Sequence, residues 1–371
     1  MPIISIVRFV LSCLLMTMLA ACQKSEPVRI GFLGGLSGRV ADLGGSGRNG
    51  VQLAVEQRNA AGGINGQPVE LVVRDDGQNP ETAKRVVGEL IGQGLELIVG
   101  PMTSSIALAI MPQINASKSV LLSPTATTTD LNGKDDGFLR VISDTTEYAS
   151  KSARYQFEKL GSRNMAVIYD LGNRSYTESW LNGFRTVFEG LGGKVVLTTT
   201  FLSGNDTVFH PLVQELLSSK ADTVLIIGNS VDSALICQQV RKLDPNRRIA
   251  MSEWASTERL IELTGPAAEG VVIAQFLDRN DTSQRYRDFL AAYKARFGQE
   301  PGFAGVAGYD AAQVALDAYT NRKQGESLKK IIIGKGKFQG VQQQLTIDRF
   351  GDADRKTFVT VVRGNKFNTV E

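Results

Sequence analysis

The sequence contains very little histidine, which limits the chemistry the chain can perform. His210 is the single histidine among 371 residues, and Pro211 follows it at the start of a predicted surface helix. A histidine-based catalytic triad and a metal site with several histidine ligands are therefore excluded. Neither a phosphate-binding Walker loop nor a nucleophile-elbow sequence is present. Carboxylates are plentiful, but nothing singles out a pair of them. We therefore predict that the chain is not an enzyme and holds no cofactor and no metal.

Cysteine is also scarce. The chain has three, Cys13, Cys22 and Cys237. The first lies in a stretch that we expect to be removed, and the second in a motif that we expect to be acylated. Cys237 is then left without a partner, so we predict no internal disulfide, although an exported protein could form one. Its surroundings have a helical pattern, and we expect it to be a small buried hydrophobic residue.

Strong charge and long apolar runs are absent from the rest of the chain. The net charge is +3, with no dense basic run and no stripe of basic and aromatic residues. Nucleic acid is therefore not an expected partner. After residue 21 no apolar stretch is long enough to suggest a membrane span. The remaining 350 of the 371 residues exceed one typical hydrophobic core, which favours two lobes.

The first 21 residues have the features of a secretory signal. Arg8 provides a positive charge, and a mostly apolar run follows over residues 9–19. The run is too short to span a bilayer comfortably, so residues 1–21 are left out of the fold. Leu-Ala-Ala-Cys at 19–22 resembles the lipobox of bacterial lipoproteins, which implies cleavage before Cys22 and a lipid on its sulfur. The alternative is an ordinary signal with an incidental cysteine. Residues 22–27 would then be a short tether.

Beyond the tether, short β-branched runs alternate with helical patterns. Strand runs that are apolar on both faces and separated by helices predict parallel sheets covered on both sides, joined by right-handed crossovers. No low-complexity linker separates the two halves, so we expect the chain to cross between them as ordered strands that act as a hinge. We predict strands over 28–34, 69–75, 95–100, 120–123, 165–170, 194–200, 223–228, 248–251 and 271–274, and helices over 50–60, 80–93, 106–115, 178–190, 209–219 and 231–243.

A glycine-rich segment over residues 45–50 matches the pattern G-x-G-x-x-G of dinucleotide-binding proteins. That fingerprint needs its first glycine in the turn directly after a strand. Here ten residues separate the glycine from the end of the preceding strand near Gly34. We therefore expect a close-packed loop that enters a helix and not a nucleotide site.

Several blocks of sequence resemble the family of leucine/isoleucine/valine-binding proteins, which are type I periplasmic binding proteins of ABC transporters. The most specific is Asn-Ala-Ala-Gly-Gly-Ile-Asn-Gly at residues 59–66. The resemblance covers essentially the whole chain after the signal, in order. The other blocks are residues 30–38, 72–76, 98–105, 122–127, 138–144 and 345–352.

The resemblance implies an α/β fold of two Rossmann-like lobes with parallel sheets, joined by a hinge of three crossovers. It places lobe 1 at residues 28–143 plus 274–334 and lobe 2 at residues 144–273 plus 335–371. It also implies that a ligand is captured in the cleft between the lobes.

Hydroxyl groups gather after two neighbouring strands of the predicted lobe 1. Ser104 lies where one strand gives way to a helix, whose N-terminus offers N–H donors and a positive dipole. Thr125 and Thr127 follow the next strand. Ligands of open parallel sheets lie beyond the carboxyl ends of the strands, so these groups suit a carboxylate or another acceptor. The alternatives are that Thr103 or Ser104 is only a helix N-cap, and that the other two residues belong to a turn rich in serine and threonine.

The family resemblance assigns roles to further residues. It implies that Ser104, Thr125 and Thr127 hold the α-carboxylate of an amino acid, and that three residues of lobe 2 face them, namely Asp144, Tyr176 and Glu253. An acidic side chain in a closed cleft would bind an ammonium group. The alternatives are a helix N-cap for Asp144, a helix start or packing for Tyr176, and a solvated loop charge for Glu253.

Two segments depart from what the family resemblance suggests. Residues 171–177 stand in place of the usual Tyr-Gly pair and are slightly longer. Asn229 stands where an aromatic residue is frequent, which makes the wall of lobe 2 more polar than a pocket for branched aliphatic side chains. Trp254 either stacks on a ligand or packs on the lobe surface.

The sequence therefore predicts an exported protein of the periplasm or cell surface, anchored to a membrane only by a lipid on Cys22. Its expected role is to capture an amino acid or a related amide-like solute for an ABC permease, as a monomer. The alternative is a ligand sensor, or an adaptor of envelope machinery, built on the same fold without a transporter.

Overall fold

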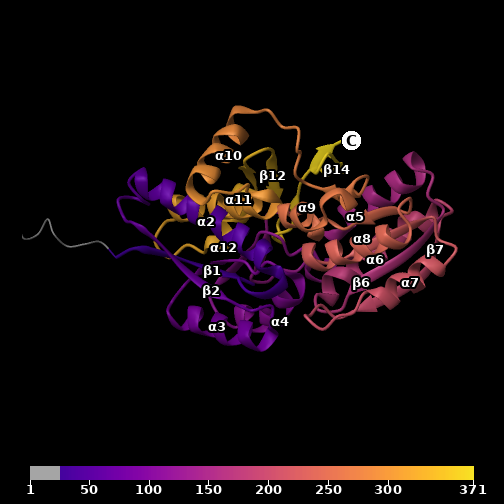
Figure 1. Cartoon of the computed structure of the whole chain (residues 1–371). Helices are drawn as coiled ribbons and strands as arrows, with labels where there is room; N and C mark the ends of the chain where they lie inside the picture. The colour runs from indigo at the N-terminus through magenta and orange to yellow at the C-terminus, as the bar shows by residue number, and fades with distance from the viewer. Residues whose placement is uncertain (1–25) are drawn as a thin grey trace, which may run out of the picture.

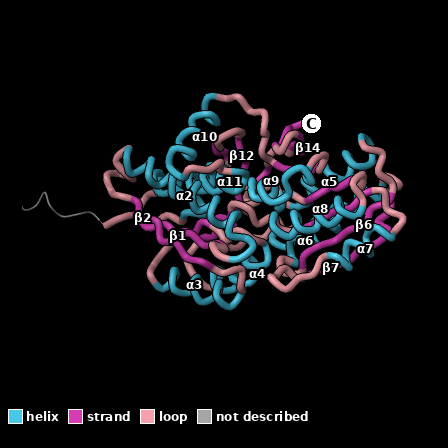
Figure 2. Tube along the Cα trace, viewed as in Figure 1, coloured by secondary structure: helices cyan, strands magenta, loops and turns pink. Residues whose placement is uncertain are grey.

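The computed structural model describes residues 26–371, which form two α/β lobes side by side (Figure 1). We call the five-stranded sheet with its covering helices the first lobe, and the seven-stranded sheet with its helices the second lobe. Figure 2 shows helices on both sides of the strands in each lobe. The predicted α/β architecture of parallel sheets covered on both faces is confirmed.

The first lobe has strand order β2-β1-β3-β4-β5, and all its pairings are parallel. Successive side chains of a strand point to opposite faces. Phe32 accordingly packs with the core that includes α2 and α11, whereas Leu33 packs with α3 and α4. The strands are β1 (Val28–Gly34), β2 (Val69–Asp75), β3 (Leu97–Val99), β4 (Val120–Ser123) and β5 (Phe138–Arg140), and the helices are α2 (Ala41–Ala60), α3 (Pro80–Gly92), α4 (Ser104–Asn115), α10 (Gln284–Phe297), α11 (Gly302–Asn321) and α12 (Leu328–Lys335).

The second lobe has strand order β15-β14-β10-β9-β8-β6-β7, in which β6 to β10 pair in parallel and β14 pairs antiparallel with both β10 and β15. The β14–β15 hairpin was not predicted. Its tight turn uses Gly364 and Asn365, both with positive φ, as two-residue hairpin turns require. The strands are β6 (Asn164–Asp170), β7 (Lys194–Phe201), β8 (Thr223–Ile227), β9 (Arg248–Met251), β10 (Val272–Gln275), β14 (Phe358–Arg363) and β15 (Lys366–Thr369), and the helices are α5 (Thr145–Arg154), α6 (Arg174–Gly190), α7 (His210–Ser218), α8 (Ser230–Leu243) and α9 (Glu258–Thr264).

Three backbone segments lie close together where the lobes meet. The Ser143 side chain accepts from the backbone N–H of Arg355, and Gln343 donates to the carbonyl of Phe276. A small antiparallel sheet follows α12 and contains β11 (Lys337–Gln339), β12 (Gln344–Ile347) and β13 (Ala353–Asp354). Its neighbourhood is tied to the first lobe by an ion pair between Asp352 and Arg140. The division of the chain at residues 143, 273 and 334 stays a prediction.

The predicted loop over residues 45–50 is wrong, because these residues lie inside α2, which begins at Ala41. The glycines serve helix packing. A Cβ atom on Gly50 would lie 2.1 Å from the carbonyl oxygen of Gly305 in α11, and one on Gly308 would lie 2.3 Å from that of Gly47. The absence of side chains lets the two helices approach closely enough for backbone contact. The pattern therefore reflects a helix crossing.

Two single residues lie as predicted. Cys237 is buried in α8, and burial raises the pKa of its thiol to about 12. His210 is exposed at the start of α7.

Candidate functional site

A small cavity lined mainly by buried residues lies between the two lobes. The volume open to the centre of a water molecule is about 20 Å³, enough for roughly one water. Two of the predicted hydroxyl residues, Thr125 and Thr127, line it together with Tyr176 and Glu253 from the opposite lobe. The other lining residues are Leu43, Met102, Ile142 and Phe303 on the first-lobe side, and Asn173 and Trp254 on the second-lobe side.

The second-lobe wall is centred on Glu253, which begins a short 3-10 helix directly after β9. Its side chain is buried, and Oε2 accepts a hydrogen bond of 2.8 Å from the indole N–H of Trp180. Its second oxygen, Oε1, has no hydrogen-bond partner among residues 26–371. Trp180 lies one helical turn after Tyr176 on α6, so one face of this helix supplies both a cavity wall and the support for Glu253.

Burial raises the pKa of Glu253 to about 7, against hydrogen bonds from a backbone N–H and from Trp180 that favour the charged form. The nearby hydroxyl of Tyr176 also lowers the pKa of Glu253, but it makes no hydrogen bond of good geometry to a residue within 26–371. Near neutral pH the carboxyl group can therefore be charged or neutral, and a cationic or N–H donor in the cavity would favour the charged form.

On the first-lobe side of the cavity, most of the predicted hydroxyl groups make hydrogen bonds within their own lobe. Ser104 Oγ accepts from the backbone N–H groups of Thr127 and Thr128, each at 3.2 Å. Thr125 Oγ1 donates to the carbonyl of Met102 at 2.6 Å. Thr127 Oγ1 is the exception, because it is buried and has no partner within the described chain. Ser104 thus positions the Thr127 loop from behind and does not line the cavity.

A side chain of the opposite lobe occupies the N-terminus of α4. The backbone N–H of Ser105 donates to Oδ1 of Asn173 at 3.0 Å, and Ser105 Oγ also accepts from the backbone N–H of Ser175 at 3.3 Å. The sequence predicted this helix end as an acceptor-binding place. The structure fills part of it with an amide oxygen that links the lobes, so a ligand carboxylate would have to share or replace that contact.

Besides Ser104, the structure leaves two more of the predicted site residues, Asp144 and Asn229, outside the lining of the cavity. Asp144 caps α5 by accepting from the backbone N–H of Thr146 at 2.7 Å, and its other oxygen accepts from Asn132 at 2.6 Å. Asn229 caps α8 and lines a separate pocket next to the cavity. Its amide nitrogen donates to Asp232 at 2.6 Å. The N-cap alternative for Asp144 therefore describes its contacts.

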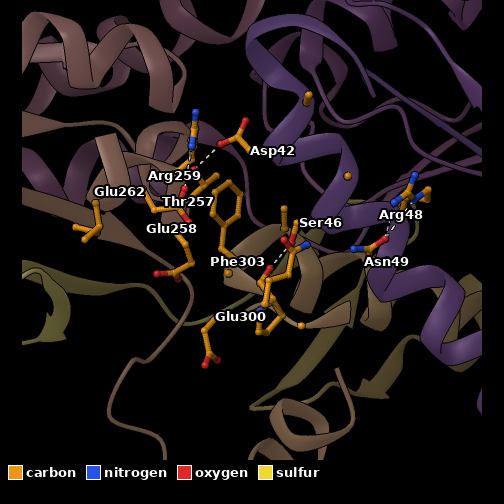
Figure 3. A pocket seen from close by; sticks show the side chains of 18 residues that line it. Asp42, Ser46, Arg48, Asn49, Thr257, Glu258, Arg259, Glu262, Glu300 and Phe303 are labelled. Carbon is orange, nitrogen blue, oxygen red and sulfur yellow. Dashed lines mark hydrogen bonds and ion pairs between the residues drawn. The ribbon is translucent and has the colours of Figure 1, made fainter. Parts of the chain in front are cut away.

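A wider pocket lies on the other side of Phe303, between α2 and α9 (Figure 3). We call it the acidic pocket, because four of its lining side chains are carboxylates. One of them, Asp42, joins the lobes: its Oδ2 accepts from Ser230 and from Thr257 of the second lobe, each at 2.6 Å. The four carboxylates are Asp42, Glu258, Glu262 and Glu300, and two arginines, Arg48 and Arg259, also line the pocket.

Several site residues escaped the sequence reasoning. Asn173 follows the carboxyl end of β6, the position at which ligands of parallel sheets are expected, and this was the signal that could have identified it. Trp180 carried a weaker signal in its spacing of four residues from Tyr176. Leu43 and Phe303 come from helices far apart in the chain, and no local pattern could have placed them at the cavity.

Residues 26–371 lack two further features. No cluster of three or more potential metal ligands is present in this part of the chain. No helix in it is long and apolar enough to cross a membrane. The predicted signal and Cys22 lie outside the described residues.

Comparison with known sequences agrees with this geometry. Residues 27–366 match the family model described as periplasmic binding protein. The chain is 26% identical over 268 residues to the Leu/Ile/Val-binding protein BraC3 of Rhizobium johnstonii, covering 71% of this chain and 72% of the relative. It is 25% identical over 334 residues to the Leu/Ile/Val-binding protein of Escherichia coli, covering 88% of each.

Solved structures share the fold. The branched-chain amino acid transporter substrate-binding protein LivJ of Streptococcus pneumoniae, in complex with isoleucine, gives a TM-score of 0.85 at 24% identity, covering 93% of this chain and 99% of that one. A solute-binding protein of an ABC transporter from R. palustris, in complex with benzoate, gives 0.84 at 17% identity, covering 93% and 95%. Members of the family are binding proteins of transporters, not enzymes. With one parallel and one largely parallel sheet, a cavity between the lobes and a family match along nearly its whole described length, the chain belongs to the Leu/Ile/Val-binding family of type I periplasmic binding proteins.

Proposed function

We propose that this solute-binding protein captures an amino acid or a related amide-like solute between its lobes and delivers it to an ABC permease. One observation carries the proposal. Three buried oxygens that have no partner within residues 26–371, Thr127 Oγ1, Tyr176 OH and Glu253 Oε1, belong to residues that line one cavity between the lobes. Leaving buried polar atoms unpaired is costly, so this arrangement favours a ligand that satisfies them.

The two sides of the cavity suit the two ends of such a solute. Thr127 offers a hydroxyl donor to a carboxylate or carbonyl oxygen, whereas Glu253 offers an acceptor to an ammonium or amide N–H. Relatives named for leucine, isoleucine and valine, and for threonine and alanine in Pseudomonas aeruginosa, point to the same solute class.

The test is a thermal-shift screen of the purified protein against L-amino acids, their amides, short peptides and small carboxylates, followed by calorimetry of the hits. We expect micromolar binding, about 8 kcal/mol of free energy. Glu253→Gln should weaken an amine-bearing hit by at least about tenfold, because a buried cation loses its partner. A screen in which only carboxylates without nitrogen bind would contradict the amino acid proposal.

We further propose that Cys22 is acylated and anchors the protein to a membrane of the periplasm or cell surface, and that the protein works as a monomer. The Leu-Ala-Ala-Cys sequence supports the lipid. The wild-type protein should partition into detergent when expressed in cells that process lipoproteins, and Cys22→Ser should abolish this. Freely soluble wild-type protein with an intact signal would contradict the anchor.

A further inference from the structure

The chain passes between the two lobes three times. It leaves β5 for α5 at residues 141–144, leaves β10 for α10 at residues 276–283, and leaves α12 for β14 at residues 336–357. We call these the first, second and third crossing segments. A change in the angle between the lobes must alter the backbone of all three, so the contacts among them decide how the lobes can move.

One residue of the third crossing segment, Arg355, contacts both of the other segments. Its backbone N–H donates to Ser143 Oγ of the first segment at 2.8 Å, and that hydroxyl donates to the Arg355 carbonyl at 3.2 Å. Its guanidinium carbon lies 4.8 Å from the ring centroid of Phe276 in the second segment, which is within the range of a cation–π contact. The three segments therefore meet at Arg355.

The same guanidinium is bound to a helix of the first lobe. Arg355 Nη2 lies 2.6 Å from Oδ2 of Asp310 on α11, and both side chains are only 1% exposed. The other oxygen of Asp310 accepts from the backbone N–H of Val341 at 2.8 Å, which binds a second point of the third segment to α11. A buried ion pair is screened much less than an exposed one, and separating its members leaves a buried charge without a partner.

The contacts of Arg355 are one-sided. Within residues 26–371, its hydrogen bonds go to Ser143 and Asp310 and to no helix or strand of the second lobe. Two residues, Lys356 and Thr357, separate it from β14 of the second lobe. Arg355 therefore moves with the first lobe, and the third segment must take up a rotation of the second lobe in the short stretch after Arg355.

We propose that Arg355 is a positioning residue for ligand capture, which holds the three crossing segments together on the first lobe so that the second lobe rotates along a single path. Without the ion pair to Asp310, each segment bends by itself and the lobes sample a wider range of relative orientations. Capture then becomes weaker, because more orientational freedom is lost when both walls of the cavity close on one solute. The inference goes beyond the proposed function, because it concerns the motion of the lobes and not the identity of the ligand.

The test removes the ion pair without leaving a buried charge. A single substitution of Arg355 or Asp310 leaves its partner charged and unpaired, which is strongly destabilising. The double variant Arg355→Met/Asp310→Asn removes both charges and keeps an oxygen for the N–H of Val341. The matched control is Arg322→Met/Glu96→Gln, which removes an ion pair of 2.7 Å between two residues of the first lobe that lie outside the crossing segments.

Distances between spin labels on the two lobes report this motion without any ligand. The labels are attached through Glu81→Cys on α3 and Glu215→Cys on α7, both at exposed positions, in a protein that carries Cys22→Ser and whose Cys237 is buried. Pulsed electron paramagnetic resonance should give a distribution of label distances at least about 1.5-fold wider for the double variant than for the labelled parent protein. The control should keep the width of the parent.

Two further variants separate motion from stability. Ser143→Ala breaks the link to the first segment without touching a charge and should also widen the distribution, whereas Arg355→Lys keeps a cation beside Asp310 and should stay close to the parent. Calorimetry with L-leucine should give about three- to tenfold weaker binding for the double variant and less than twofold for the control.

Unchanged widths in both Ser143→Ala and the double variant would overturn the proposal, and so would equal widening in the control. A parent protein that binds no amino acid and no amide would contradict the proposed function alone, because the label distances need no ligand.

Discussion

The two sides of the cavity differ in how far their buried polar groups are satisfied by hydrogen bonds. On the first-lobe side, Thr125 in the wall and Ser104 behind it hydrogen-bond to loops of their own lobe, and Thr127 keeps a hydroxyl without a partner among residues 26–371. On the second-lobe wall, Tyr176 and Glu253 are buried with polar atoms that lack partners within the described chain. Most polar groups of the first wall are therefore satisfied by hydrogen bonds, whereas the second wall holds most of the buried polar atoms that still lack a partner.

The largest expected effect on stability comes from Glu253 in the second wall. Its raised pKa of about 7 means that the folded state binds a proton more tightly than the unfolded state. The free energy of unfolding should therefore decrease as pH rises from about 4.5 to about 7, by about 3 kcal/mol from this group. Glu253→Gln should remove that share of the slope and raise the stability at pH 8, as measured by urea unfolding at several pH values.

Two other buried carboxyls provide the control for this experiment. Burial also raises the pKa of Asp76 and of Asp170 to about 6, so each adds a slope of the same sign at lower pH. Asp76→Asn should therefore leave the part of the slope between pH 6 and 7 largely intact. If Glu253→Gln leaves the dependence of the free energy of unfolding on pH unchanged, burial of Glu253 does not destabilise the folded protein as we expect.

Two substitutions on the first-lobe side compare a hydroxyl that is hydrogen-bonded to the backbone with one that has no partner among the described residues. Ser104→Ala should lower the free energy of unfolding by about 1–3 kcal/mol, because two buried backbone N–H groups lose their acceptor. Thr127→Val should leave stability unchanged or raise it slightly, because it removes a buried hydroxyl without a partner. The same Thr127→Val protein should bind a carboxylate-bearing ligand about tenfold more weakly. Equal destabilisation by both changes would show that the distinction is wrong.

The contacts between the lobes give an effect of intermediate size. Asp42→Ala removes the acceptor of Ser230 and Thr257 and should destabilise this arrangement of the two lobes by about 1–2 kcal/mol. Small-angle scattering of the protein without ligand should then give a larger radius of gyration, and a saturating ligand should restore the smaller value. Glu262→Gln is the control, because Glu262 lines the same pocket but pairs with Arg259 of its own helix. A radius that Asp42→Ala leaves unchanged would contradict a role in closure.

The smallest effect is expected at Asp144, which the structure places outside the cavity. Asp144→Ala removes a helix cap and should cost about 1 kcal/mol of stability. Calorimetry with any ligand found should give the same affinity for this variant as for the wild-type protein. A tenfold loss of affinity would return Asp144 to the binding site.

The sequence by itself determined the fold class and the order of nearly all the predicted strands. Apolar runs such as 223–227 can be buried only in a sheet covered on both faces, so the periodicity was sufficient. It also placed Thr125 and Thr127 after β4, because the ends of parallel strands are where cleft residues lie. The family resemblance added Tyr176 and Glu253, and both line the cavity.

What only the tertiary structure decided depends on contacts between distant segments. In the sequence, the glycines over 45–50 match a nucleotide-binding pattern. Only the structure shows that they allow α2 to pack closely against α11. Asp144 and Glu253 are both acidic residues after strand ends, and only packing shows that one is a half-exposed cap and the other a buried group held by Trp180. Local sequence sets which backbone a segment can adopt, whereas burial, pKa and access to a cavity depend on what the rest of the chain places beside it.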